Sequence, residues 1–95
     1  MCDPVATRRV RVSRPAGLHA RPCMAISNIV NQCQSRVELQ FGDKTANAAS
    51  ILELMSMGAG QGAELQLSAC GPDAERVLDA LAFLFENNFG LPLED

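Results

Sequence analysis

The sequence predicts a single α+β domain, and three patterns in its 95 residues lead to that expectation. Four short segments alternate apolar and polar residues, as half-buried strands do. Segments between and after them space their apolar residues as amphipathic helices do. Two of the strand-like segments are separated only by Gly42-Asp43, which is typical of a hairpin. Because a hairpin pairs its strands antiparallel, this mixture favours α+β over a doubly wound parallel sheet.

The first predicted strand and the first predicted helix flank a loop that contains proline and glycine. Residues 5–12 interleave arginines with Val10 and Val12, which suits a strand with one buried face. Residues 13–17 form the loop, and an amphipathic helix is expected over residues 20–33. Its apolar stripe comprises Cys23, Ile26, Ile29, Val30 and Cys33.

A hairpin and a short helix follow. Alternating apolar residues predict a second strand over residues 37–41 and a third over residues 44–48. Ser50 and Glu53 have the spacing of a capping box, in which each side chain accepts a hydrogen bond from the other residue's backbone N–H. A short helix should therefore begin after this serine, and the glycines within residues 58–62 should end it.

One more strand and one more helix complete the order. Apolar residues alternate within residues 63–69, and Gly71-Pro72-Asp73 opens a final helix, since proline and acidic residues are favoured at a helix start. Residues 91–95 should fray as a tail, so that residues 1–95 form one domain with a core over about residues 5–89. The last helix has a core stripe of Val77, Leu78, Leu81, Leu84 and Phe85.

Charge and hydropathy exclude several classes of protein. The formal net charge is -3 at pH 7 and the basic residues form no dense run, which argues against a nucleic-acid binder. Five of the eight basic residues nevertheless precede Pro22. They either form a basic face at the end of the domain that carries the only histidine, His19, or line a solvated strand edge. No apolar run could span a membrane and no signal peptide is evident, so we expect a cytoplasmic monomer. The five basic residues are Arg8, Arg9, Arg11, Arg14 and Arg21.

The four cysteines, Cys2, Cys23, Cys33 and Cys70, are expected to be free thiols. No pair has the two-residue gap of a metal or redox motif, and the cytoplasm is reducing. Cys23 and Cys33 fall on the apolar side of the first helix and Cys70 ends a strand, so all three are expected to be small core residues. His19 and Cys23 would supply only half of a zinc site, so we expect no metal and no cofactor.

The only histidine, His19, directly precedes the first predicted helix. A helix start has backbone N–H groups without intrahelical acceptors and a partial positive charge, so a phosphate held there gains charge-assisted hydrogen bonds. Neutral imidazole is a nucleophile near pH 7, and Arg21 would spread the charge of the phosphoryl oxygens. Pro22 suits a first turn, so the helix begins at Ala20 or at Pro22. A lone histidine beside an arginine is more often a cap or a surface residue, so these residues alone do not decide the function.

Two segments resemble those of a known family. Gly17-Leu18-His19-Ala20-Arg21-Pro22 resembles the active-site motif of the HPr family, the small phosphocarriers of bacterial phosphotransferase systems, and all six residues match. Residues 48–58 are similar to the family's regulatory-serine helix and lie at the family's distance from the histidine motif. The strand and helix pattern also matches, so the resemblance covers nearly the whole chain. It departs at Ala49, where many members carry lysine before the serine.

The resemblance implies a fold and a function. The fold is an open-faced sandwich, in which a four-stranded antiparallel sheet carries three helices on one face in the order β-α-β-β-α-β-α. In the implied function His19, assisted by Arg21, accepts a phosphoryl group from enzyme one of the phosphoenolpyruvate-dependent phosphotransferase system. The group then passes to an enzyme-two-type A protein. Such a protein is a stoichiometric carrier and not an enzyme.

The resemblance also implies regulation and a docking surface. Ser50 would be phosphorylated by a serine kinase and released by a phosphorylase, although it is a helix cap whether or not it is regulatory. The apolar side chains around it either meet partner proteins or fill the core. The residues implied in partner binding are Ile51, Leu52, Met55, Ala20 and Cys23.

Two other functions remain open from the sequence. A regulatory module of the same fold would control nitrogen or carbon metabolism through protein contacts, and Asn87-Asn88-Phe89 resembles the nitrogen-related branch. Some regulatory members lack the histidine, so the presence of His19 favours the carrier. A small zinc or nucleic-acid module is the unrelated alternative. The sequence does not identify a transported sugar.

Overall fold

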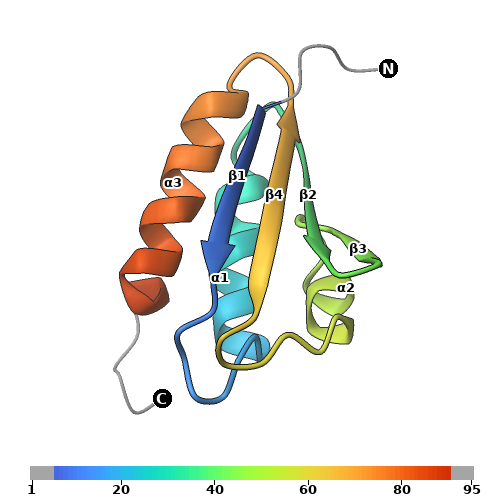
Figure 1. Ribbon diagram of the computed structural model, residues 1–95. Helices are drawn as coiled ribbons and strands as arrows, with labels where there is room; N and C mark the ends of the chain where they lie inside the picture. The colour runs from blue at the N-terminus through green and yellow to red at the C-terminus, as the bar shows by residue number, and fades with distance from the viewer. Residues whose placement is uncertain (1–5, 91–95) are drawn as a thin grey trace.

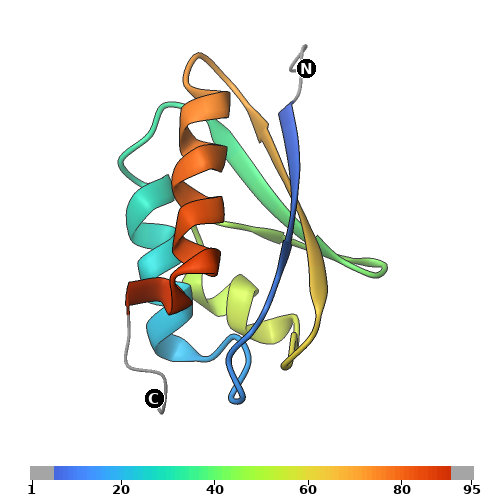
Figure 2. The same cartoon turned by 60° about the vertical axis from the view of Figure 1, so that its left-hand side comes forward.

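A computed structural model describes residues 6–90 and has the predicted α+β architecture. A four-stranded antiparallel sheet carries three helices on one face, in the order β-α-β-β-α-β-α (Figures 1 and 2). The other face of the sheet is open. The elements are β1 (Ala6–Arg11), α1 (Ala20–Val30), β2 (Arg36–Phe41), β3 (Lys44–Asn47), α2 (Ile51–Ser56), β4 (Glu64–Cys70), α3 (Ala74–Glu86) and a final 3-10 turn, η1 (Asn88–Gly90).

The sheet has the strand order β1-β4-β2-β3, so the first and third strands are its edges. Leu67 on the central strand β4 lies opposite Leu39 of β2, and both are fully buried under the helices. Along the next row the polar residues Arg9, Gln66 and Gln40 are in register on the open face. Period-two alternation therefore separates the core from solvent, as the sequence predicts.

Helix α1 is shorter than its apolar stripe suggests. It begins at Ala20, as one of the two expected starts, but it ends at Val30 and leaves Cys33 in the following turn. Asn31 is its C-cap: the backbone N–H makes the last regular helical bond, to the carbonyl of Ser27, and the side-chain Nδ2 donates to the same carbonyl at 2.8 Å. A side chain that bonds the last carbonyls competes with continuation of the helix.

The capping box at the start of α2 forms only in part. The Ser50 hydroxyl accepts from the N–H of Glu53 at 3.2 Å, as predicted. The Glu53 carboxylate instead accepts from the N–H of Asn47 at 2.9 Å, because the N–H of Ser50 already donates to the carbonyl of Asn47 at 3.0 Å. The carboxylate therefore joins the end of β3 to the helix, and the serine remains the N-cap.

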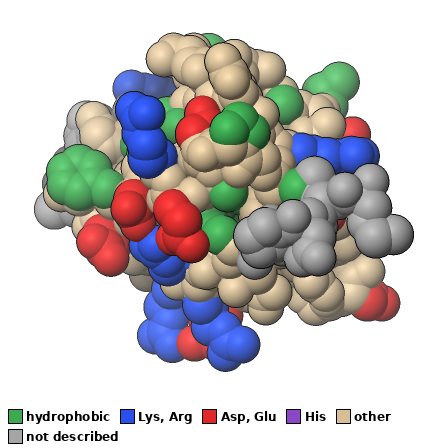
Figure 3. Space-filling view, turned by 90° about the horizontal axis from the view of Figure 1, so that it is seen from above, with side chains coloured by type: hydrophobic (Ala, Val, Ile, Leu, Met, Phe, Trp, Pro, Cys, Tyr) green, Lys and Arg blue, Asp and Glu red, His purple; other side chains and the backbone are tan. Residues whose placement is uncertain are grey.

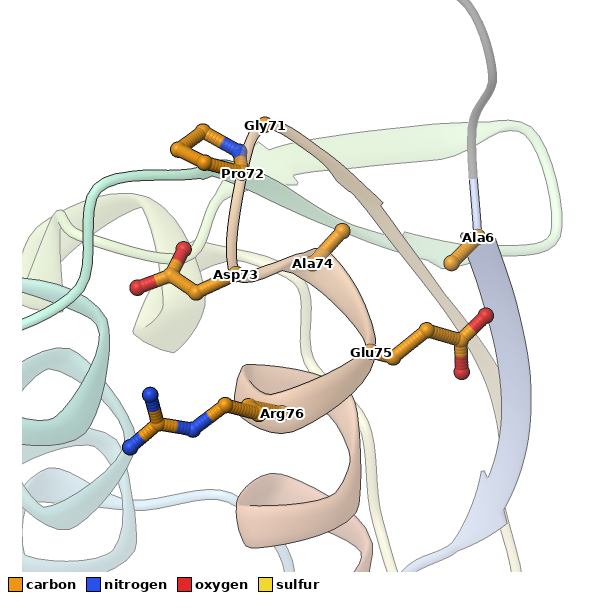
Figure 4. A pocket seen from close by; sticks show the side chains of 7 residues that line it. All are labelled: Ala6, Gly71, Pro72, Asp73, Ala74, Glu75 and Arg76. Carbon is orange, nitrogen blue, oxygen red and sulfur yellow. The ribbon is translucent and has the colours of Figure 1, made fainter.

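A polar contact joins the α1–β2 connection to the start of α3. The Asp73 carboxylate accepts from the Ser35 hydroxyl and from the N–H of Gln34, the latter at 3.0 Å. A Cβ on Gly71 would lie 2.6 Å from the Cα of Ser35, so the two connections touch closely. Figure 4 shows the Asp73 carboxylate directed towards this connection and Glu75 directed towards β1. The contact holds the end of the sheet that is farther from His19.

This contact makes the stability of the domain depend on pH. The hydrogen bond from Ser35 and then that from the Gln34 N–H lower the pKa of Asp73 below its ordinary value of 3.8. A carboxyl with a lowered folded-state pKa stabilises the fold above its unfolded pKa, and this stabilisation disappears as the pH falls through the folded value. We expect Asp73→Asn to lower the free energy of unfolding at pH 7 and to match the wild type in strong acid. Urea titrations across this range measure the difference, and Asp43→Asn in the exposed β2–β3 turn is the control. Equal stability at neutral pH would contradict the assignment.

Candidate functional site

His19 is the N-cap of α1. Its backbone is extended, with φ -107° and ψ -165°, and its carbonyl accepts the N–H of Cys23 at 3.1 Å. The imidazole makes no side-chain capping bond, so the ring is not used to hold the helix. Amides in a helical first turn have no intrahelical acceptor, and the helix dipole adds a partial positive charge. The site is thus a half-exposed imidazole at the positive end of an 11-residue helix.

The two ring nitrogens of His19 differ in their surroundings. Nε2 is buried and has no hydrogen-bond partner among the described residues. Neutral imidazole has one N–H and one lone pair, so burial of one nitrogen makes the two positions chemically unequal.

The loop that carries His19 rests on the connection between α2 and β4. The N–H of Leu18 donates to the carbonyl of Ala59 at 2.9 Å, and the Leu18 side chain is buried. Gly17 has φ +71°, and a Cβ there would lie 2.5 Å from the Ala59 oxygen. Only glycine combines this left-handed backbone with so close an approach. The glycine of the motif is therefore explained by packing.

Arg14 is a site residue that the sequence did not reveal. It is one of the five basic residues that precede Pro22, yet it is only 1% exposed. Its Nη1 donates to the carbonyl of Asn88 at 3.1 Å. Asn88 and Phe89 have φ of 56° and 60°, and the Phe89 ring packs edge-on against Phe85 at a centroid distance of 4.8 Å. Arg14 therefore attaches the C-terminal turn to the histidine loop, and nothing about an arginine before a proline indicates burial.

Arg8, Arg9 and Arg11 line strand β1, and two of them pair with carboxylates. Arg8 pairs with Asp79 of α3 at 2.5 Å, and Arg11 pairs with Glu64 of β4 at 2.7 Å. The Arg11 hydrogen bond holds the pKa of the Glu64 carboxyl below its usual value. Figure 3 shows charged side chains of both signs, and no histidine, at the end opposite the start of α1. The predicted solvated strand edge is therefore the better interpretation.

The predicted contact of Cys23 with partner proteins is not supported. Its side chain is 0% exposed in the core, and burial raises the pKa of its thiol to about 11. Helical spacing correctly put it on the apolar side of α1, and that side faces inward. Ala20, by contrast, is exposed directly beside His19.

The remaining cysteines differ from one another. Cys33 is a free, half-buried thiol whose Sγ lies 3.3 Å from the carbonyl of Ser35. Cys70 is disulfide-bonded, so the expectation of free thiols is wrong there. Cys70 ends β4 on the side where β1 begins, a position that cysteine spacing along the chain does not reveal. Within residues 6–90 no three His, Cys, Asp or Glu side chains gather as metal ligands.

Helix α2 lies next to α1. It begins after the predicted regulatory residue Ser50 and carries the predicted docking residues Ile51, Leu52 and Met55. Asn31 at the end of α1 donates to the carbonyl of Ala49 at 3.4 Å, so the two helices are linked at this end. Leu52 is 80% exposed and Met55 is 42% exposed, whereas Ile51 is half-buried against the core. Of the predicted docking residues on this helix, two are therefore open to a partner. In the described part of the chain no helix has the length and apolar character needed to cross a membrane.

Comparisons with known proteins agree with this geometry. The family described as "PTS HPr component phosphorylation site" matches residues 6–87. The chain is similar to the phosphocarrier protein HPr of Treponema pallidum (strain Nichols), with 39% identity over 90% of this chain and 97% of that protein. It is also similar to the phosphocarrier protein NPr of Proteus mirabilis (strain HI4320), with 35% identity over 86% of this chain and 92% of that one.

A solved structure gives the same result for the fold. The crystal structure of HPr-C-His from Thermoanaerobacter tengcongensis superimposes with a TM-score of 0.87 at 34% identity, covering 93% of this chain and 99% of that one. Members of the matched family carry phosphoryl groups stoichiometrically and are not enzymes. The histidine at the start of α1, the four-stranded sheet with three helices and the match over residues 6–87 together show that this chain belongs to the HPr family of phosphotransferase-system phosphocarriers.

Proposed function

We propose that this protein carries a phosphoryl group on His19, accepted from enzyme one of the phosphotransferase system and passed to an enzyme-two-type A protein. The observation that carries this proposal is the half-exposed imidazole at the start of α1, which has no capping role. A phosphoryl group there lies where first-turn amides and the helix dipole favour negative charge. Family membership supports the two classes of partner and a cytoplasmic location.

Burial of Nε2 supports Nδ1 as the nitrogen that takes the phosphoryl group. With the imidazole proton on Nε2, Nδ1 holds the lone pair that attacks phosphorus. The Nδ1–phosphorus bond forms as the bond between phosphorus and the donor protein breaks. Arg21 is exposed two residues away, and its guanidinium would spread charge over the phosphoryl oxygens during transfer.

Ser50 is proposed as a site of regulatory phosphorylation by a serine kinase, reversed by a phosphorylase. Its hydroxyl is half-buried and accepts from Glu53, so a kinase would have to open this cap. Negative charge is tolerated at a helix start, so the fold should survive modification. The effect would fall on partner proteins, because it places charge beside the exposed Leu52.

A carrier of the nitrogen-related branch is the second candidate. The observation that favours it is the similarity to a relative named NPr, over nearly the same part of the chain as the similarity to HPr. Phosphoryl transfer to a sugar-type and to a nitrogen-type enzyme-two A protein, compared at equal concentrations, separates the two branches. Faster transfer to the nitrogen-type acceptor would favour regulation over sugar uptake.

The first prediction from this proposal concerns His19. Incubation with enzyme one and phosphoenolpyruvate should give an acid-labile, base-stable adduct, because phosphoramidates hydrolyse in acid. His19→Ala should abolish the adduct and leave the thermal unfolding transition nearly unchanged, since the ring makes no capping bond. Mass spectrometry locates the phosphate and NMR of the ring distinguishes Nδ1 from Nε2. Phosphate on another residue would exclude the proposed role of His19.

The second prediction concerns Arg21. Replacing a guanidinium that contacts a charged group costs about 1.5–3 kcal/mol, or roughly one to two decades in rate. Arg21→Ala should therefore slow transfer from enzyme one by this factor. Arg21→Lys should also be slower than wild type, because an ammonium does not reproduce the planar fork. Rapid-quench kinetics measure both rates, and unchanged kinetics in Arg21→Ala would show that the arginine takes no part in transfer.

The third prediction concerns Ser50 and separates its structural and regulatory roles. Ser50→Ala should lower the free energy of unfolding by about 1 kcal/mol through loss of the cap. Ser50→Asp and Ser50→Asn should both keep the cap and a melting temperature near that of the wild type. Only Ser50→Asp should slow transfer from enzyme one, because only it adds charge. Equal rates in the two capped variants would leave Ser50 a structural residue alone.

A further inference from the structure

Cys70 carries a covalent bond that the proposed function does not use. Its sulfur is in a disulfide, whereas Cys23 and Cys33 are free. The chain has four cysteines, so Cys2, which lies outside the described residues, is the one that remains as a partner. In a reducing cytoplasm a disulfide is usually transient, and it then takes part in catalysis or in sensing the redox state. No redox catalysis belongs to the proposed function, so the bond points to a response to oxidation.

Cys70 lies at the end of β4 on the open face of the sheet. Burial alternates along β4, and Cys70 has the parity of Gln66 on the open face, whereas Leu67 and Ala69 are buried. The Cys70 side chain is half-buried and does not belong to the hydrophobic core. The three helices cover the other face (Figure 2), so small thiols and disulfides can approach from this one.

The register of the sheet brings Cys2 within reach of Cys70. Ala6, the first residue of β1, is paired with Ala69, the chain neighbour of Cys70. Paired residues of an antiparallel sheet have Cα atoms about 4.5–5.5 Å apart. Cys2 precedes Ala6 by four residues, which span at most about 14 Å. Disulfide-bonded cysteines need Cα atoms about 4.4–6.8 Å apart, and a segment of this length is sufficient to meet that condition.

The other two cysteines lie on the helix side of the sheet. Cys23 is fully buried in the core, and Cys33 lines a hollow between α1 and α3. The sheet separates both of them from the face that carries the sulfur of Cys70. Neither can pair with it unless the fold opens, because a disulfide requires closely spaced and suitably directed Cβ atoms.

We propose that Cys2 and Cys70 form a reversible disulfide that ties the start of β1 to the end of β4 when the surroundings become oxidising. The oxidant is a low-molecular-weight disulfide. The thiolate of one cysteine attacks it and releases a first small thiol, and the second cysteine then attacks the mixed disulfide and releases another. In total the two cysteines lose two electrons and two protons, and the small disulfide gains them as two thiols.

The bond acts on an edge strand that leads directly into the loop that carries His19. The partner of β1 is β4, and the pair of Ala6 with Ala69 lies at the end where fraying begins. A bond from residue 2 to residue 70 closes most of the chain into a loop, which lowers the conformational entropy of the unfolded chain. It lies at the end of the sheet opposite the start of α1 (Figure 1), so its effect reaches the histidine loop through β1.

Peptide mapping of the full chain tests the pairing. The protein is incubated with oxidised or with reduced glutathione, its free thiols are alkylated, and its tryptic peptides are identified by mass spectrometry. Trypsin places Cys2 on residues 1–8 and Cys70 on residues 45–76, and it leaves the other two cysteines together on residues 12–36. The oxidised protein should give residues 1–8 joined to residues 45–76, and the reduced protein should give the two peptides apart.

Thermal unfolding and hydrogen exchange test the consequence. The oxidised wild type should melt about 8 °C or more above the reduced protein, because the bond closes a long loop in a domain of this size. The amides of β1 should also exchange more slowly in the oxidised protein. Cys2→Ser and Cys70→Ser should melt as the reduced wild type does under both conditions. Cys33→Ser, which removes a free thiol, is the matched control and should retain the whole shift.

Three outcomes would overturn the inference. The first is an oxidised protein in which residues 45–76 are joined to residues 12–36, to a second copy of the chain or to glutathione alone. The second is an oxidised wild type that melts within about 2 °C of the reduced protein. The third is a Cys33→Ser variant that loses the shift. None of these readouts uses phosphoryl transfer, so a failure of the proposed function is distinct from all three.

Discussion

The contact of Gly17 and Leu18 with Ala59 is the constraint on which the functional site depends. It joins two connections that are far apart in sequence, and it fixes where the chain turns into α1. Any side chain at Gly17 would meet the Ala59 carbonyl, so the approach of the two backbones is possible only with glycine. The position of His19 is therefore determined by backbone packing and does not depend on hydrogen bonds from its own ring.

This arrangement connects the site to the rest of the sheet. The N–H of Val12 donates to the carbonyl of Ala63 at 2.9 Å, so the pairing of β1 with β4 continues into the two loops. Lys44 of β3 donates to the carbonyl of Met57 at 3.4 Å, at the end of α2. On the other side Arg14 holds the turn at Asn88. The histidine loop is thus supported from both edges of the sheet, and a mobile loop would lose the alignment that transfer requires.

Most of the fold could be predicted from the sequence because its apolar periodicity is regular. Buried apolar residues and exposed polar residues alternate along the strands, and the central pair Leu39 and Leu67 is buried as expected. The end of α1 could not be predicted, because the choice between continuing the apolar stripe to Cys33 and bonding the last carbonyls through Asn31 depends on what the next turn contacts. The incomplete capping box at Ser50 and Glu53 could not be predicted either, because it also depends on a contact between separate elements. Glu53 reaches Asn47 only because β3 ends beside α2.

The site was predictable in part for a similar reason. His19 and Arg21 stand in a local motif, and a helix start can be located from local sequence. Burial of Arg14 and of Cys23 depends on residues distant in sequence, and no local pattern distinguishes a buried arginine from a solvated one. Arg14 shows the difference most clearly, since its observed acceptor is a backbone carbonyl 74 positions away. The local sequence around Arg14 therefore does not indicate such a contact.

The structure also bears on how tightly a carrier can hold its cargo. A group that must leave again for an acceptor is served poorly by a buried cation, because charge pairs away from water are strengthened in a low dielectric. Arg14, the fully buried cation of the histidine loop, is turned to the carbonyl of Asn88. The amides of a helix start, which have no intrahelical acceptor, are partly solvated contacts for a phosphoryl group on His19. Each such contact contributes about 0.3–1 kcal/mol through the helix dipole, so a helix start binds the group more weakly than a buried cation would.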